Sequence, residues 1–219
     1  MADFHQNGNI AQFHNLRARP LEELVYEIEA FSQVRKISLI LPSLYSELEG
    51  EALPAILDEL AEVPYLHRII IGLDRADEAQ YRAARKFFAR LPQDHVVLWN
   101  DSPRMKEIGA RLEAMGLAPQ EPGKGKNVWS AIGYLIACAD SAVMAIHDCD
   151  ILTYDREMLA RLVYPVAHPG FSYQLSKGYY PRVGEGKLNG RVTRLLVSPL
   201  LIALKKVIGD RDYIEYLRA

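Results

Sequence analysis

The chain has 219 residues, of which 49% are apolar, and its 26 basic and 28 acidic side chains give a formal charge of −2. This length allows one well-buried domain with a short appendage, and the near-neutral charge gives no electrostatic reason to expect nucleic acid or an anionic membrane as a partner. No apolar stretch approaches the ~20 residues that cross a bilayer, and the first residues lack the apolar core of a signal peptide, so we expect a cytoplasmic protein.

Helix-like and strand-like segments alternate along the chain from Pro20 onward. Pro20 opens an amphipathic helix that runs to about Ala30, since proline is favoured at the first helical position. The apolar run 37–42 follows as a buried strand of a parallel sheet. The same patterns predict further helices at 50–62, 78–91, 103–116 and 127–139, and further strands at 67–73, 96–99 and 142–147. This alternation indicates the α/β class, with a mostly parallel central sheet flanked by helices.

Both ends of the chain depart from this alternation. Residues 1–19 are polar and without periodicity, so we treat them as a segment that precedes an α/β domain of residues 20–155. Residues 156–219 form a region of different character. There we expect a helix at 155–164, a strand or hairpin at 171–182, a glycine-containing loop at 184–190, a helix at 192–207 and a short helix from Asp210.

Polar side chains follow each of the four predicted strands, at 43–47, 74–77, 100–101 and 147–150. Ligands of parallel α/β sheets bind beyond the carboxyl ends of the strands. Contact with solvent explains polar residues at any one strand end about as well, but it explains all four together less well. The pattern therefore predicts a binding site at this edge of the sheet.

The sharpest motif is Asp148-Cys149-Asp150, which places two carboxylates at the exit of the fourth strand. Mg²⁺ and Mn²⁺ prefer such oxygen ligands and can bridge them to a diphosphate, and the metal stabilises the charge of a departing diphosphate. A solvated turn is the alternative, and it is less favoured at this place in an α/β domain. The motif predicts a metal and a nucleoside-diphosphate sugar, as in retaining or inverting glycosyltransferases. Cys149 is expected to be a packing residue.

Two glycine-containing motifs precede predicted helices. Gly123-Lys124-Gly125 combines a flexible backbone, a cation and free N–H groups, which suit an anion, although a solvated basic turn explains it equally well. Gly190-Arg191-Val192-Thr193 suits a phosphate or carboxylate, or is an ordinary helix cap.

The histidines give weaker signals. His67 and His95 begin strands, which favours structural roles, and His147 either orients a ligand or packs in the core. The fingerprints of nicotinamide binding, serine hydrolases and zinc proteases are absent from the sequence.

Taken in order, these motifs resemble those of the glucosyl-3-phosphoglycerate synthases and the related mannosyl-3-phosphoglycerate synthases, which are retaining glycosyltransferases. The likeness covers roughly residues 36–205. The motifs that carry it are Leu41-Pro42-Ser43-Leu44-Tyr45-Ser46-Glu47, Asp74, Gly123-Lys124-Gly125 with Trp129, Asp148-Cys149-Asp150, Lys177 with Tyr180, and Gly190-Arg191-Val192-Thr193.

The resemblance implies a GT-A (Rossmann-like) nucleotide-diphospho-sugar transferase fold. It also implies that glucose, or another hexose, passes from a nucleoside-diphosphate sugar to the 2-hydroxyl of 3-phosphoglycerate with retention, in the presence of Mg²⁺ or Mn²⁺. Asp150 would be the main metal ligand, with Asp148. The implied donor-binding residues are Pro42, Ser43, Leu44, Ser46, Glu47, Asp74, Lys124 and Asp148. The implied acceptor-binding residues are Lys177, Tyr180, Gly190, Arg191, Val192 and Thr193.

The resemblance assigns no catalytic residue, and members of this family continue past the position that matches Ala219. We therefore expect residues 156–219 to be the start of an acceptor-binding region, without the later histidine that completes the metal shell. Two alternatives stay open: a glycosyltransferase of the same fold with another acceptor, or a non-catalytic fragment that binds nucleotide sugars. The helices of 192–217 could also form a homodimer.

Overall fold

The computed structural model of the chain describes residues 10–14, 19–117, 119, 121–179, 183–184, 187–188 and 193–209. Among these residues, no helix has both the length and the apolar character needed to cross a membrane.

Four parallel strands form the central sheet, in the order β4-β3-β2-β5. Their bounds are Ile37–Leu44 (β2), Leu66–Asp74 (β3), His95–Trp99 (β4) and Val143–Ile146 (β5). Leu44 pairs with Asp74 and Leu73 pairs with Trp99, so the carboxyl ends of the neighbouring strands meet at one edge. The predicted α/β class with a parallel central sheet is confirmed.

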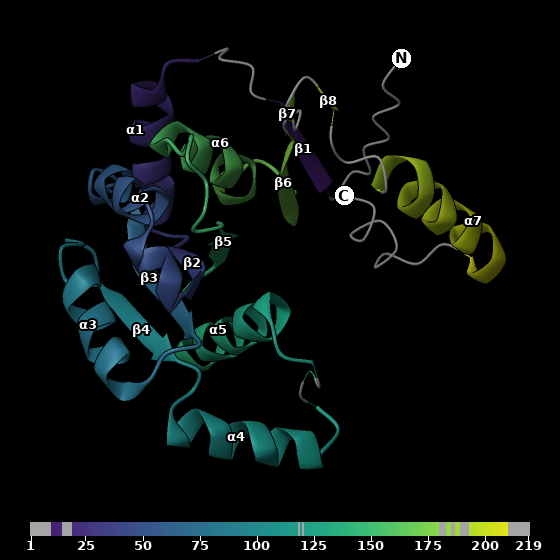
Figure 1. Cartoon of the computed structure of the whole chain (residues 1–219). Helices are drawn as coiled ribbons and strands as arrows, with labels where there is room; N and C mark the ends of the chain where they lie inside the picture. Colours follow the sequence, from purple (N-terminus) through teal and green to yellow (C-terminus); the bar gives the residue numbers. More distant parts are fainter. Residues whose placement is uncertain are drawn as a thin grey trace.

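Helices cover both faces of this sheet (Figure 1). Because successive strand residues point to opposite faces, Leu39 and Ile71 pack in a large apolar cluster, whereas Ile40 and Ile70 pack against α5. The helices of the large cluster are α1 (Leu21–Ser32), α2 (Ala52–Ala61), α3 (Glu78–Phe88) and α6 (Arg156–Ala167). The opposite face is covered by α5 (Lys124–Cys138).

The start of α5 differs from the sequence prediction. We expected a helix from Asn127, but α5 begins at Lys124, and Gly123 is its N-cap with a φ of 141°. That backbone conformation suits glycine because a Cβ would be strained there. Lys124 is therefore presented by the first helical turn. The preceding helix, α4 (Pro103–Ala114), contains no buried residue and lies below α5 in Figure 1.

The segments outside the central sheet also differ from expectation. Residues 1–19 were predicted only as a polar segment without periodicity, yet they contain β1 (Ile10–His14), which pairs in parallel with β6 (Leu175–Tyr179). The predicted loop at 184–190 contains the antiparallel pair β7 (Val183–Gly184) and β8 (Lys187–Leu188). The predicted helix at 192–207 is a π-helical turn, η2 (Thr193–Val197), followed by α7 (Ser198–Ile208). The short helix expected from Asp210 lies outside the described residues.

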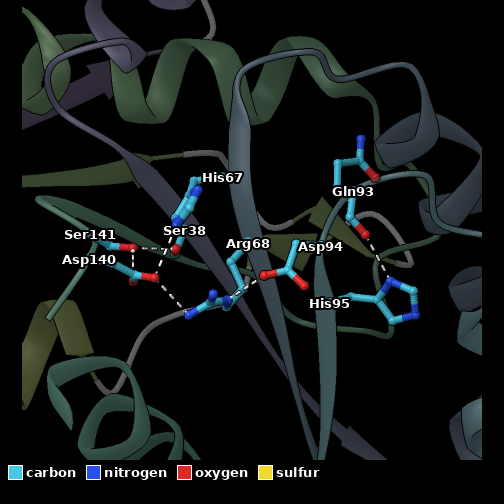
Figure 2. Close-up of polar contacts among 8 residues, drawn as sticks. All are labelled: Ser38, His67, Arg68, Gln93, Asp94, His95, Asp140 and Ser141. Atoms are coloured by element: carbon cyan, nitrogen blue, oxygen red, sulfur yellow. Dashed lines mark hydrogen bonds and ion pairs between the residues drawn. The ribbon is translucent and has the colours of Figure 1, made fainter. Parts of the chain in front are cut away.

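A network of side chains connects the strands at the amino-terminal edge of the sheet (Figure 2). Asp140 Oδ2 lies 3.1 Å from His67 Nε2 and 3.0 Å from an Arg68 guanidinium nitrogen, and Arg68 Nε donates to Asp94 Oδ2 at 2.7 Å. His95 Nδ1 lies 2.9 Å from the carbonyl oxygen of Gln93. His67 and His95 thus lie on the edge opposite the predicted site, in contacts that fit structural roles.

Candidate functional site

A pocket of about 800 Å³ opens at the carboxyl edge of the central sheet. It brings together residues from all four strand ends, which the sequence placed far apart. Those residues are Pro42, Ser43, Leu44, Glu47, Asp74, Arg75, Asn100, Asp101, Asp148, Cys149 and Asp150. A parallel sheet of this topology commonly holds its ligand at this edge.

Most of the predicted donor-binding residues line this pocket. Pro42, Ser43, Leu44, Glu47, Asp74, Lys124 and Asp148 do so, together with the predicted metal ligand Asp150. Ser46 does not: it lies in the short 3₁₀ helix η1 (Tyr45–Glu49) with its side chain exposed. Glu47 has a local role as well, because its Oε2 accepts a 3.0 Å hydrogen bond from Leu44 N at the start of η1.

The Asp148-Cys149-Asp150 turn follows β5 and places both carboxylates at the pocket. Lys124 forms an ion pair with Asp148 across the mouth of the pocket. Cys149 is 2% exposed, as expected for a packing residue, and burial raises the pKa of its thiol. His147 Nδ1 lies 3.1 Å from Tyr154 Oη, and burial lowers the pKa of His147 to about 4. His147 is therefore a neutral residue that packs in the core against Tyr154, next to the turn.

The donor set of this turn fits a divalent metal that is shared with a substrate. Within the described ranges, no group of three or more histidine, cysteine, aspartate or glutamate side chains could hold a metal ion by itself. Asp148 and Asp150 supply two carboxylates at the pocket. Mg²⁺ is commonly held in this way, by one or two carboxylates plus substrate phosphates and water.

The ends of β3 and β4 form the other side of the pocket. Asn100 Nδ2 donates a 2.7 Å hydrogen bond to Asp74 Oδ1, and Asp101 Oδ2 accepts from Ala76 N at 3.1 Å. Burial raises the pKa of Asp74, while hydrogen bonds from Asn100 and Asn127 oppose that shift. Arg75 adopts a φ of 55°, a left-handed conformation that is uncommon for residues other than glycine and clusters at binding sites.

Sequence reasoning missed several residues of this pocket. Asn100 and Asp101 were noted as polar residues at a strand end, and that position was the available signal. Helices α4 and α5 add an apolar wall to the pocket, and of its residues only Trp129 belongs to a motif named from the sequence. The wall is formed by Met105, Ile108, Gly109 and Leu112 from α4, and Trp129, Gly133, Tyr134 and Ala137 from α5.

The structure tests few of the predicted acceptor residues. Lys177 is an exposed residue of β6 and does not line the pocket. Thr193 begins η2. The described residues do not include Tyr180, Gly190, Arg191 or Val192. The acceptor assignment therefore stays a prediction from the resemblance.

Comparison with known proteins supports the resemblance. No protein-family model matches the chain. The chain is 46% identical over 217 residues to the glucosyl-3-phosphoglycerate synthase of Persephonella marina, covering 99% of this chain and 54% of the relative. It is 37% identical over 201 residues to that of Methanococcoides burtonii, covering 90% and 49%. The chain thus spans about half the length of these curated relatives.

Solved structures share the fold. One is glucosyl-3-phosphoglycerate synthase of Mycobacterium tuberculosis in complex with Mn²⁺, UDP-glucose and phosphoglyceric acid, with a TM-score of 0.57 and 22% identity. The match covers 91% of this chain and 59% of that chain. The same enzyme with Mg²⁺ and UDP has a TM-score of 0.56. At this level of identity the comparison shows the fold, whereas the curated relatives show the sequence relationship to these synthases.

Proposed function

We propose that this chain forms the donor site of a glucosyl-3-phosphoglycerate synthase. In this function, glucose or another hexose passes from a nucleoside diphosphate to 3-phosphoglycerate, with retention of the anomeric configuration. The observation that carries the proposal is the convergence of Asp74, Lys124, Asp148 and Asp150 on one pocket at the strand ends. The 46% identity to a synthase of this name across nearly the whole chain supports it.

The two ends of the pocket suit the two ends of a nucleoside diphosphate. At the end formed by β3 and β4, the Asp74 carboxylate, oriented by the hydrogen bond from Asn100, offers acceptors to a nucleobase or ribose. At the other end, the Lys124 ammonium can exchange its contact with Asp148 for a phosphate oxygen. The lysine thereby orients the diphosphate next to the two carboxylates.

Asp150 and Asp148 would hold the Mg²⁺ or Mn²⁺ that this function requires. When bound, such an ion stabilises the charge that develops on the departing diphosphate. The relatives of known structure contain Mn²⁺ or Mg²⁺ together with UDP, which supports the same assignment here.

For the acceptor, the proposal keeps the residues implied by the resemblance. Arg191 and the backbone of Gly190 to Thr193 would bind the carboxylate and phosphate of 3-phosphoglycerate, with Lys177 and Tyr180 nearby in the sequence. A related structure is a complex with phosphoglyceric acid.

A homodimer is a further part of the proposal. Several apolar side chains of α7 are exposed, including Leu200 at 63% and Val207 at 82%. Apolar patches of this kind often mark interaction surfaces. Light scattering at several protein concentrations would test the prediction, and a monomer at all of them would contradict it.

Calorimetry tests the donor site directly. UDP-glucose should bind in the presence of Mg²⁺ and bind much more weakly after addition of EDTA. Release of UDP should then be stimulated by 3-phosphoglycerate but not by glycerate or glucose. Stimulation by another acceptor would favour a different glycosyltransferase. Absence of any UDP-glucose binding would contradict the proposal.

A chimera can separate a competent donor site from a non-catalytic module. It joins this chain to the C-terminal part of the Persephonella marina relative, and the same release assay is applied to it. Turnover by the chimera alone would show that this chain supplies a competent donor site. Binding without turnover in both proteins would support the non-catalytic alternative.

A further inference from the structure

The first turn of α5 reaches both ends of the pocket. Lys124 pairs with Asp148 at the end of β5. Asn127, three residues later and on the same side of the helix, contacts β3 near Asp74. Lys124 is largely exposed, whereas Asn127 is only 3% exposed. One helical turn therefore contacts both the Asp148-Cys149-Asp150 turn and the end of β3 on the other side of the pocket.

Asn127 occupies the space that a side chain at position 72 would fill. Its Nδ2 donates a 2.8 Å hydrogen bond to the carbonyl oxygen of Gly72. A Cβ added at Gly72 would lie 1.8 Å from Asn127 Oδ1, which is far inside van der Waals contact. Glycine at position 72 is thus required by the buried amide, and the pair holds the first turn of α5 against the carboxyl end of β3.

The hydrogen bond to Gly72 uses the nitrogen of the Asn127 amide and leaves its oxygen unexplained. Asn127 Oδ1 is buried and has no hydrogen-bond partner among the described residues. A buried, unpaired polar atom costs stability relative to an apolar side chain of similar size. The amide also acts on a neighbour: it is bonded to the backbone two residues before Asp74, and it lowers the pKa of that carboxyl against the effect of burial.

Other groups around the pocket also affect the pKa of Asp74. Arg75 and Asp101 act on it with opposite signs, and Asn100 donates to it from β4. Other charged residues of the pocket are Glu47, Lys106, Lys124, Lys126, Asp148 and Asp150. From α5, the group that acts on the pKa of Asp74 is the Asn127 amide.

We propose that Asn127 is a positioning residue of the donor site, which fixes the Asp74 carboxylate for the nucleotide and seats the first turn of α5 so that Lys124 reaches the diphosphate. The inference rests on the proposed function, because it takes the pocket to bind a nucleotide. It extends that function to a residue that the resemblance does not assign.

The test uses Asn127→Ala, the near-isosteric Asn127→Asp, and Gly72→Ala with and without Asn127→Ala. Asn127→Ala removes the bond to Gly72 that positions both Asp74 and Lys124, so UDP binding should weaken by roughly tenfold at pH 7. Without the amide, the pKa of Asp74 rises, so the acid limb of the UDP-binding profile should move to higher pH. In Asn127→Asp the added carboxylate should raise the pKa of Asp74 more, so the acid limb should move to a still higher pH.

The glycine variants form a double-mutant cycle. Gly72→Ala should weaken UDP binding because its Cβ displaces the amide. In the Asn127→Ala background the same change should have little further effect, since the clashing atoms are gone. Additive losses would contradict the proposed contact. A carboxyl NMR titration of Asp74 without ligand should show the same upward shift in both single alanine variants.

The outcomes separate this inference from the proposed function. UDP binding by the wild-type chain, with unchanged affinity and pH profile in a folded Asn127→Ala or Asn127→Asp variant, would overturn only the role of Asn127. Loss of affinity without a shift of the acid limb or of the Asp74 titration would reduce Asn127 to a packing residue. Absence of UDP binding by the wild-type chain would overturn the proposed function and this inference with it.

Discussion

Asn100 Nδ2 donates a 2.7 Å hydrogen bond to Asp74 Oδ1, and the bond joins the ends of two adjacent parallel strands. The backbone repeats the connection, because Asn100 N donates to Leu73 O at 3.0 Å. Asn100 Oδ1 is buried and has no partner among the described residues. The pair therefore fixes the orientation of the Asp74 carboxylate at the edge of the pocket.

We expect Asn100→Ala to weaken UDP binding. The variant loses a hydrogen bond to a carboxylate, so the expected loss is about 1.5–3 kcal/mol. Asn100→Asp should be worse, because a second carboxylate would lie against Asp74. Calorimetric titration with UDP measures both. An unchanged dissociation constant for Asn100→Ala, with the fold intact by circular dichroism, would contradict a nucleotide contact at this side of the pocket.

Asp150→Ala should remove the metal-dependent part of UDP-glucose binding. With EDTA present, the variant and the wild type should bind alike, and addition of Mg²⁺ should strengthen binding only in the wild type. Asp94→Asn is a suitable control, since Asp94 lies in the network at the opposite edge of the sheet. The metal assignment fails if Asp150→Ala binds UDP-glucose with Mg²⁺ as tightly as the wild type.

Lys124→Met should weaken UDP much more than uridine. The ammonium lies beside Asp148, where the diphosphate is expected, so the lost contact involves phosphate and corresponds to about 1.5–3 kcal/mol for a charged hydrogen bond. Added salt should reduce the difference because exposed charges are screened. Lys86→Met, on α3, is the matched control. Equal losses for UDP and uridine would place Lys124 away from the diphosphate.

Asp140→Asn should flatten the acid dependence of folding stability. The hydrogen bond with His67, and then the charge of Arg68, lower the pKa of Asp140 below its usual value. A carboxylate that is more acidic in the folded state stabilises it fully above the unfolded pKa of about 4. That contribution is lost as the pH falls through the lower folded value. Urea unfolding at several pH values measures the slope, and parallel curves for variant and wild type would disprove the linkage.

Arg191→Ala should weaken 3-phosphoglycerate and spare the donor. A bidentate, charge-assisted contact to a phosphate or carboxylate suggests a loss on the order of 1.5–3 kcal/mol. Calorimetry with 3-phosphoglycerate and, separately, with UDP-glucose distinguishes the two sites. Should the variant lose UDP-glucose and keep 3-phosphoglycerate, the acceptor assignment of the 190–193 motif would be wrong.

The sequence was sufficient for the order and type of most elements of the α/β domain. Alternating apolar runs and amphipathic segments predicted β2 to β5 and the helices between them, because burial of apolar side chains imposes a periodicity that is local. The start of α5 was placed three residues late, since the Gly123 conformation that caps it is set by the path of the chain. β1 was missed because its pairing with the distant β6 defines it more than its own residues do.

For the site, residue type and position alone predict which strand ends carry polar residues and which motif carries two carboxylates. The hydrogen bond from Asn100 to Asp74, and the fit of Asn127 over Gly72, 55 residues away along the chain, emerge only when the chain is folded. Such contacts depend on the register of strands and the seating of α5 on the sheet. Those are products of packing between distant segments, and no local pattern encodes them.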